Sequence, residues 1–238
     1  RVGVAGQFVQ REGQCIALQK VTSLNLRIAR SCVIPLPPAL DKLLEQHFTG
    51  LLVVGEPGSG KTTTLMATIN ALKDDLRIGV MEADIDSDVD AATISTSGAK
   101  VIQLHTGGMC HLDAGMTQQG LRELGTDDLD LVVLENVGNL VCPAEFDTGA
   151  VKNAMILSVP EGHDKPLKYP LIFTVCDALI INKIDVLPYF DFDMDKVVEY
   201  AHRRNPNLKI FPISAKSGLG VDAWRQWLLE ETEAWKKG

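Results

Sequence analysis

Residues 55–62 read Gly55-Glu-Pro-Gly-Ser-Gly-Lys-Thr62 and directly follow the apolar run Leu51-Leu-Val-Val54. They fit the pattern G-x-x-x-x-G-K-[ST] of a phosphate-binding loop, and the sequence after them predicts a helix. Glycines in such a loop allow backbone N–H groups to converge on phosphate oxygens, and the helix N-terminus adds its positive end. Strand, glycine-rich loop and helix in this order predict a nucleotide phosphate site rather than an ordinary turn.

The residues of this loop have separate predicted roles. The Lys61 ammonium is expected to bridge the β- and γ-phosphates, and the Thr62 hydroxyl is expected to ligate Mg²⁺. The full set predicted to bind the nucleotide here is Glu56, Pro57, Gly58, Ser59, Gly60, Lys61, Thr62 and Thr63.

Short apolar runs alternate with helical stretches after residue 50. The predicted strands are Leu51–Gly55, Ile78–Met81, Val101–Leu104, Leu129–Leu134, Ala154–Val159, Ala178–Ile181 and Ile210–Ile213. The predicted helices are Gly60–Lys73, Asp88–Thr96, Asp113–Glu123, Asp193–Arg204 and Val221–Ala234. Several strands are continuously apolar, which is typical of strands covered on both faces. The pattern predicts an α/β P-loop NTPase with a mostly parallel sheet and helices on both faces.

The first 50 residues have a different pattern. Ser23-Leu-Asn-Leu-Arg-Ile-Ala29 alternates as a half-buried strand does, and Pro35, Pro37 and Pro38 then interrupt the chain. A short helix is predicted over 39–48, ending at Thr49-Gly50. We therefore expect a small β/α appendage over residues 1–50 and a P-loop nucleotide-binding domain over residues 51–238.

Charge and cysteine content exclude several classes of protein. The 238 residues hold 31 acidic and 23 basic side chains, a net charge of −8, which disfavours binding to nucleic acid. No apolar run reaches the roughly 18 residues of a membrane span, so no membrane association is expected. Five cysteines spread over a long chain do not form a secreted disulfide framework and indicate a reducing compartment. We expect a cytoplasmic protein.

A second nucleotide motif, Asn182-Lys-Ile-Asp185, follows the apolar run ending at Ile181. N-K-x-D after a strand and downstream of a phosphate loop is the guanine reader of GTPases. The Asp185 carboxylate can accept hydrogen bonds from guanine N1–H and the exocyclic amine, whereas adenine offers no donor at that edge. Asn182 would tie this loop to the phosphate loop, and the Lys183 stem would cover the base. The guanine oxygen would meet a backbone N–H from the segment Ser214, Ala215 and Lys216.

Three further side chains could hold a metal ion. Cys110 and His111 follow one predicted strand, and Cys142 follows another. The carboxyl ends of parallel strands share one edge of the sheet, and thiolate with imidazole suits Zn²⁺ or Ni²⁺. Residue spacing alone leaves open a second interpretation, two packed thiols beside a hydrogen-bonded histidine. Three ligands do not close a site, so a symmetric dimer or solvent would complete it. The other cysteines, Cys15, Cys32 and Cys176, are interpreted as packing residues.

Four stretches resemble the hydrogenase nickel-incorporation GTPases, the HypB family. They are Cys110-His-Leu-Asp-Ala114, Glu135-Asn-Val-Gly-Asn-Leu-Val-Cys-Pro143, Asp164-Lys-Pro-Leu-Lys-Tyr-Pro170 and Ser214-Ala-Lys-Ser-Gly218. The resemblance extends over about residues 51–235. It implies a SIMIBI-type G domain that dimerises with GTP and loads nickel into [NiFe]-hydrogenase. The implied partners are a hydrogenase maturation protein or the hydrogenase large subunit.

The resemblance also implies roles for individual residues. It assigns Cys110, His111 and Cys142 to the nickel or zinc site. Lys61, Asp84 and Glu135 become the catalytic set, with Thr62, Asp84 and Glu135 on the magnesium side. Asp86 and Asp88 are alternatives to Asp84 in the same acidic stretch.

This sequence departs from the family pattern at several positions. Ala83 stands where Gly is usual, Thr93 where Arg is usual, and Pro160 interrupts a stretch that usually carries Thr. The cysteine-rich amino-terminal motif of some members is missing, so a high-affinity nickel site of that kind is not expected.

The first 50 residues resemble a different group. Arg1-Val-Gly-Val-Ala-Gly6 and Ser23-Leu-Asn-Leu-Arg-Ile-Ala-Arg30 look like the region before the phosphate loop in sporulation stage III AA-type ATPases. A chimeric chain is therefore one interpretation. Two alternative functions follow: a P-loop ATPase of the sporulation or secretion type, and a non-enzymatic, zinc-stabilised P-loop dimer.

Overall fold

The computed structural model describes residues 2–11, 14–26, 48–84, 93–106 and 108–237. Its chain divides into two compact units, Arg1–Glu45 and Gln46–Gly238. In the first unit, β1 (Val2–Arg11) and β2 (Gln14–Leu26) form an antiparallel hairpin with Val2 opposite Leu26. The predicted strand from Ser23 overlaps the end of β2. The helix predicted over 39–48 falls, up to residue 47, outside the described residues.

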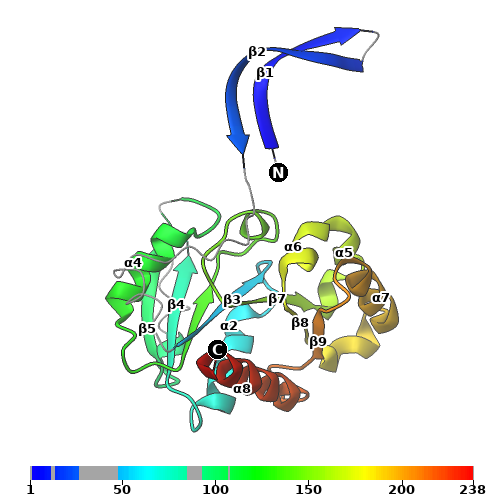
Figure 1. Ribbon diagram of the computed structural model, residues 1–238. Coiled ribbons are helices and arrows are strands. Elements are labelled where there is room, and N and C mark those ends of the chain that lie inside the picture. Colours follow the sequence, from blue (N-terminus) through cyan, green and yellow to red (C-terminus); the bar gives the residue numbers. More distant parts are fainter. Residues whose placement is uncertain (1, 12–13, 27–47, 85–92, 107, 238) are drawn as a thin grey trace. The chain divides into compact units, whose positions relative to one another are not determined.

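A seven-stranded sheet forms the centre of the second unit (Figure 1). Its strands are β3 (Thr49–Gly55), β4 (Ile78–Asp84), β5 (Lys100–His105), β6 (Leu131–Glu135), β7 (Lys152–Ser158), β8 (Ala178–Asn182) and β9 (Lys209–Pro212). They are ordered β5-β4-β6-β3-β7-β8-β9, and every neighbouring pair is parallel. Each of the seven strands predicted after residue 50 is present.

The main helices are α2 (Lys61–Leu72), α4 (Ala114–Leu124), α5 (Lys165–Lys168), α6 (Pro170–Val175), α7 (Met194–Arg204) and α8 (Val221–Lys237). Helices α2, α4, α6 and α7 lie in connections between strands of the sheet, as crossovers between parallel strands require. Short 3₁₀ turns occur at η1 (Cys142–Ala144), η2 (Val159–Glu161) and η3 (Ile184–Tyr189). Aspartates at positions 113 and 193 cap α4 and α7 by accepting a backbone N–H. The sequence did not predict α5 and α6, because they are shorter than three turns. The predicted helix Asp88–Thr96 lies mostly outside the described residues.

Two apolar layers hold the sheet between its helices. Along β3, Leu51 and Val53 pack with α2 and α8, whereas Leu52 and Val54 pack on the opposite face with α6 and α7. Both sets are buried, as expected for a strand whose successive side chains face opposite helix layers. On the α2–α8 side, Trp224 Nε1 donates to Thr68 Oγ1 at 2.9 Å, which satisfies the indole N–H of a fully buried ring.

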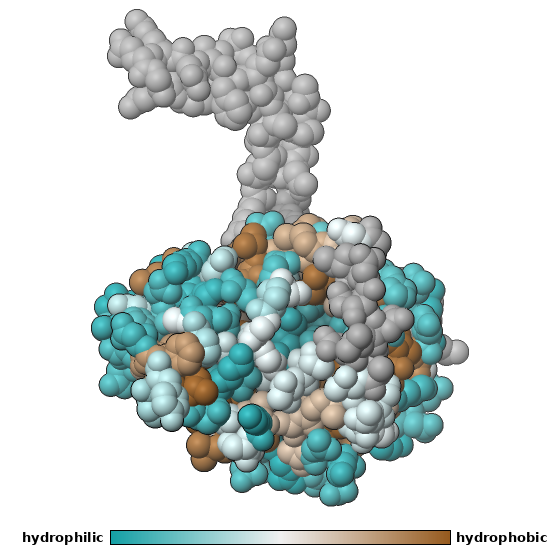
Figure 2. Space-filling model, turned by 180° about the vertical axis from the view of Figure 1, so that it is seen from behind, coloured by the Kyte–Doolittle hydropathy of each residue, from teal (hydrophilic) through white to brown (hydrophobic). Residues whose placement is uncertain are grey.

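Hydrophilic residues cover much of the face drawn in Figure 2. On the face drawn in Figure 2, hydrophobic residues form separate patches among hydrophilic ones. None of the helices described in the structure has the length and apolarity needed to cross a bilayer.

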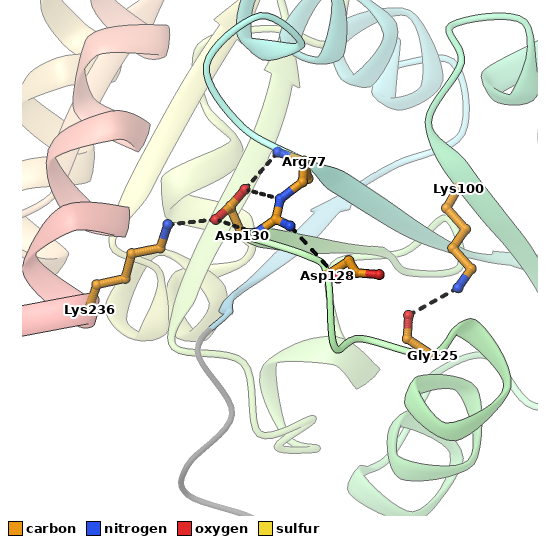
Figure 3. Close-up of polar contacts among 6 residues, drawn as sticks. All are labelled: Arg77, Lys100, Gly125, Asp128, Asp130 and Lys236. Atoms are coloured by element: carbon orange, nitrogen blue, oxygen red, sulfur yellow. Dashed lines mark hydrogen bonds and ion pairs between the residues drawn. The ribbon is translucent and has the colours of Figure 1, made fainter.

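An ion-pair network lies at the amino ends of β4 and β6 (Figure 3). Arg77 donates to Asp130 through its backbone N–H at 2.9 Å and its Nε at 3.0 Å. Lys236, near the end of α8, donates to the other carboxylate oxygen at 2.7 Å. These hydrogen bonds, Arg77 first, hold the pKa of Asp130 well below its usual range. The network therefore ties the last helix to the sheet through one largely buried carboxylate.

Asp130→Asn is expected to lower the free energy of unfolding by about 2 kcal/mol at pH 7, because it weakens charge-assisted hydrogen bonds. The folded-state pKa lies below the unfolded value of about 3.9. The wild-type contribution is thus complete above that value and declines as the pH falls through it. Urea titration at pH 7 and pH 3 should show a smaller difference at pH 3.

Asp128→Asn is the matched control for this network. Asp128 lies 3.9 Å from Arg77, but its side chain is 95% exposed, so its removal should change stability by less than about 0.5 kcal/mol. Equal effects of the two substitutions would contradict the assignment.

Candidate functional site

The carboxyl ends of the parallel strands meet at one edge of the sheet, and the predicted functional residues follow them. The phosphate loop follows β3, Cys110 follows β5, and Glu135 is the last residue of β6. Asn182 ends β8, and Ser214 comes after β9. Ligands of open α/β sheets bind at this edge. The register places Glu135 beside Val53 of β3 and Glu82 of β4.

A cavity of about 550 Å³ lies over the phosphate loop, a size suited to a nucleotide. Eight residues predicted for this site line it: Pro57, Gly58, Gly60, Lys61, Thr62, Thr63, Glu135 and Lys183. Four further lining residues were not predicted, namely Glu82, Ala83, Asn136 and Gly138. Gly138 sits in the quoted E-N-V-G stretch, but only the strand order brings it against the phosphate loop.

Asn182 and Lys183 join the predicted guanine-reader loop to the phosphate loop. Asn182 Nδ2 donates to the Ser59 carbonyl at 3.1 Å, and Lys183 Nζ donates to the Gly58 carbonyl at 2.7 Å. The Asn182 Oδ1 atom accepts from the backbone N–H groups of Lys183 and Ala215. Asn182 is 2% exposed, so these bonds satisfy a buried amide.

The remaining residues predicted to read guanine lie beside this junction rather than in the cavity lining. Asp185 is exposed, in the first turn of η3. Ser214 is buried, Ala215 is half-buried and Lys216 is exposed. The Ala215 N–H is held at 3.1 Å from Asn182 Oδ1, so the two loops that would contact the base are fixed to each other.

The predicted magnesium residues are only partly described. Thr62 Oγ1 donates to Glu135 Oε1 at 3.1 Å, and Glu135 is 3% exposed, so this hydroxyl–carboxylate pair faces the cavity. Asp84 is the last residue of β4, in register with His105. The Asp84 side chain, Asp86 and Asp88 lie outside what the structure describes. Oxygen donors of this kind are the ligands that Mg²⁺ prefers.

Glu56 has a different partner from the predicted nucleotide. Its carboxylate forms an ion pair with Lys165, a buried lysine of α5 whose Nζ also lies 3.9 Å from Glu161. Burial opposes ionisation of Glu56, but the hydrogen bond and charge of Lys165 hold its pKa below the usual value. Burial raises the pKa of Glu161. Lys165 of α5 therefore holds the phosphate loop through Glu56. The Asp164-Lys-Pro stretch of the sequence did not reveal this contact.

Cys110, His111 and Cys142 lie together at the surface. Their possible ligand atoms all fall within 4.8 Å of one another. The Cys110 and Cys142 Sγ atoms are 2.8 Å apart, and Cys110 Sγ is 3.9 Å from His111 Nδ1. The hydrogen bond with Cys110 raises the pKa of the Cys142 thiol. The His111 ring stacks on Phe146 with centroids 3.6 Å apart, which restricts its rotation. Two sulfurs and an imidazole are a donor set for Zn²⁺ or Ni²⁺.

Cys176, the remaining cysteine whose side chain the structure describes, lies outside this cluster. Cys176 is buried in the apolar layer against α6 and α7, and burial strongly raises the pKa of its thiol. The side chain of Cys15 and the whole of Cys32 lie outside the described residues.

Comparison with known proteins agrees with this arrangement. The family model described as CobW/HypB/UreG, nucleotide-binding domain matches residues 50–212. The probable hydrogenase maturation factor HypB of Methanocaldococcus jannaschii is 39% identical over 182 residues, which are 76% of this chain and 82% of that protein. The chain belongs to the HypB family. The fold class predicted from the sequence, a SIMIBI-type P-loop NTPase with a parallel sheet, is thereby confirmed.

Two further members illustrate the match. Hydrogenase maturation factor HypB of Escherichia coli K12 is 47% identical over 178 residues, which are 75% of this chain and 61% of that protein. HypB from Helicobacter pylori, crystallised in complex with nickel, superposes with a TM-score of 0.75 at 36% identity. That superposition covers 82% of this chain and 91% of the other. The chain thus spans under two thirds of the E. coli protein. The comparisons lend no support to the resemblance of residues 1–50 to sporulation ATPases.

Gly60→Ala is expected to destabilise the ligand-free protein more than Gly58→Ala. Both glycines have positive φ angles, 88° and 80°, so each alanine carries backbone strain of about 1 kcal/mol. A Cβ at Gly60 would also lie 2.5 Å from Asn182 Nδ2, whereas one at Gly58 meets nothing within 4 Å. Displacing the Asn182 amide should cost about 1–3 kcal/mol more in the free energy of unfolding. Equal stability of the two variants in urea would refute the Asn182 junction.

Proposed function

We propose that this chain is a Mg²⁺-dependent GTP hydrolase that acts as a nickel metallochaperone in [NiFe]-hydrogenase maturation. One observation carries the proposal: a single segment, Glu135–Cys142, lines the nucleotide cavity at its start and supplies a thiol of the Cys–His cluster at its end. Family membership supports both halves of the function. Residues 51–238 would form the GTPase domain, and residues 1–50 would be an appendage to it.

GTP is the proposed nucleotide because of the loop that Asn182 holds in place. The Asp185 carboxylate would pair with the two donors of guanine, and the Ala215 N–H lies on the adjoining loop. Lys183 adopts a left-handed conformation, with φ of 64°, and its stem runs toward the phosphate loop. With adenine bound, the Asp185 carboxylate would lack its two hydrogen-bond donors. The site would therefore discriminate against adenine through these unpaired polar groups rather than through shape.

Hydrolysis would depend on positioning and charge, as phosphoryl transfer does in general. Lys61 and the loop amides would neutralise the β- and γ-phosphates. Thr62 with Glu135, and Asp84 at the end of β4, would hold the magnesium ion, which supplies charge compensation at the γ-phosphate. Catalysis of this kind relies little on a general base, and slow turnover is expected in isolation.

Wild-type protein should hydrolyse GTP with magnesium and use ATP far less well. Asp185→Asn should reduce kcat/KM for GTP by a factor on the order of 10⁴, because the amide cannot accept both guanine donors. The same variant should gain use of xanthosine triphosphate, whose carbonyl replaces the exocyclic amine. Lys61→Ala should lose activity with each nucleotide. Equal wild-type use of GTP and ATP, measured by phosphate release, would overturn the guanine assignment.

Nickel is the proposed cargo of Cys110, His111 and Cys142. Their ligand atoms already converge, and Cys110 is exposed, so an ion could enter and leave from solvent. The nickel complex of the H. pylori relative supports this assignment. Free thiols at the surface favour a reducing compartment, and we propose a cytoplasmic location. A hydrogenase maturation protein or the hydrogenase large subunit would receive the ion.

A nucleotide-dependent homodimer is the proposed assembly. Tyr189 at the end of η3 is 82% exposed, and the following Phe190 is 45% exposed, close along the chain to the guanine-reader Asp185. Apolar side chains exposed in this way are typical of interaction surfaces. A second copy of the chain would cover Tyr189 and Phe190, and the dimer would then contain two Cys–His clusters. Nucleotide bound at Asp185 would stabilise this dimer contact.

Nickel affinity should depend on nucleotide state, and Cys142→Ser should abolish tight nickel binding in either state. Titration with Ni²⁺ and a competing chromophoric chelator, with GDP and then with a non-hydrolysable GTP analogue, tests both points. Coupling is reciprocal, so nickel should change GTP affinity by the same factor. The dimer fraction should rise with the analogue. Nickel binding that is unaffected by nucleotide and by Cys142→Ser would reject the metallochaperone function.

A further inference from the structure

Asn139 connects the two loops that carry the metal-binding thiols. Its Nδ2 donates a short hydrogen bond to the carbonyl of Cys110, and its Oδ1 accepts from the backbone N–H groups of Val141 and Cys142, each at 2.9 Å. The opposite amide orientation would set oxygen against carbonyl and nitrogen against two donors, so this network fixes which way the amide points. One half-buried side chain thus bonds the backbone of both cysteines.

The two thiols come from different loops, so contacts between those loops set their spacing. Cys110 follows β5 and Cys142 follows β6, and β4 lies between these strands in the sheet. The ligand loops therefore come from strands that do not pair with each other. Asn139 supplies a direct bond between the loops at the thiols themselves, next to the Leu112–Asn136 bond, and the Sγ atoms lie 2.8 Å apart beside it.

The segment that holds Asn139 is also fixed to the nucleotide cavity. Glu135 accepts from Thr62 of the phosphate loop, and Asn136 Oδ1 accepts from Leu112 N–H, next to His111. A Cβ at Gly138 would lie 2.9 Å from Pro57, so backbone and phosphate loop are in close contact immediately before Asn139. A change at the γ-phosphate would reach Asn139 within this one segment.

We infer that Asn139 is a positioning residue for the metal site, setting the separation of Cys110 and Cys142 and making it follow the nucleotide-contacting segment. The inference rests on the proposed function, since it assumes that these thiols hold the ion. Hydrogen bonds that orient metal ligands typically change metal affinity by about 10- to 100-fold when removed. Asn139 itself does not touch the ion.

The variant Asn139→Asp distinguishes two roles of Asn139: the bond to the Cys110 loop, and the local capping of the turn at Val141 and Cys142. The variant keeps the oxygen that accepts from Val141 and Cys142, but replaces the donor to the Cys110 carbonyl with a second acceptor. The added negative charge alone would strengthen cation binding. A loss of nickel affinity therefore reports the broken tie and not electrostatics. Asn139→Ala removes both contacts, and Asn207→Asp adds the same charge on the exposed turn before β9.

The experiment titrates the reduced chain of residues 1–238 with Ni²⁺ against a chelator and records the thiolate-to-nickel charge-transfer band. Asn139→Asp and Asn139→Ala should each bind nickel about 10- to 100-fold more weakly, with a shifted band and a smaller affinity difference between the GDP and GTP-analogue states. Asn207→Asp should match wild type, and circular dichroism would verify folding.

Two results would overturn the inference in distinguishable ways. Wild-type affinity, band position and nucleotide dependence in Asn139→Asp, with binding lost in Cys142→Ser, would leave the proposed function standing and reduce Asn139 to a turn cap. Nickel binding that survives Cys142→Ser would reject the metal site itself and the role of Asn139 with it.

Discussion

Parallel pairing of β3 with β6 on one side and β7 on the other is the constraint on which the site depends. The register that sets Val53 beside Glu135 brings the phosphate loop next to the end of β6. The same pairing lets Thr62 donate to Glu135 and brings Gly138 against Pro57. A shift of one residue would turn the buried side chains of β3 toward the wrong helix layer, so the two apolar layers hold the register in place.

This arrangement uses few residues for two kinds of chemistry. The phosphate loop presents backbone amides and one ammonium to an anion, on a chain whose net charge is −8. The Cys–His cluster presents soft donors to a cation at the same sheet edge. Residues 135–142 contribute to both, so under the proposed function an ion at one site and a phosphate at the other would act on the same short piece of backbone. Coupling of this kind needs no long pathway through the core.

Contacts outside the two sites hold the loops at the ligand edge. Lys165 pairs with Glu56 of the phosphate loop, and Asn182 joins that loop to the segment proposed to read guanine. At the opposite end of the sheet, Asp130 accepts hydrogen bonds from Arg77 and Lys236, which hold α8 against the sheet. The rigid base allows the ligand loops to carry exposed polar groups without loss of the fold.

The sequence by itself determined the class of fold, because G-x-x-x-x-G-K-T between an apolar strand and a helix has few other uses. It also predicted residues for guanine and metal, since Asn182, Asp185, Cys110 and Cys142 stand in recognisable stretches. Local patterns found every strand of the parallel sheet but not α5 and α6, which are too short to show a period.

Only the tertiary structure decided which of these residues act together. Glu82, Asn136 and Gly138 line the cavity because strand order puts β4 and β6 beside β3. Lys165 reaches Glu56 across 109 positions, and Asn139 reaches Cys110 across 29. A side chain's partner at such separations depends on how strands and helices pack, and spacing along the chain does not record that.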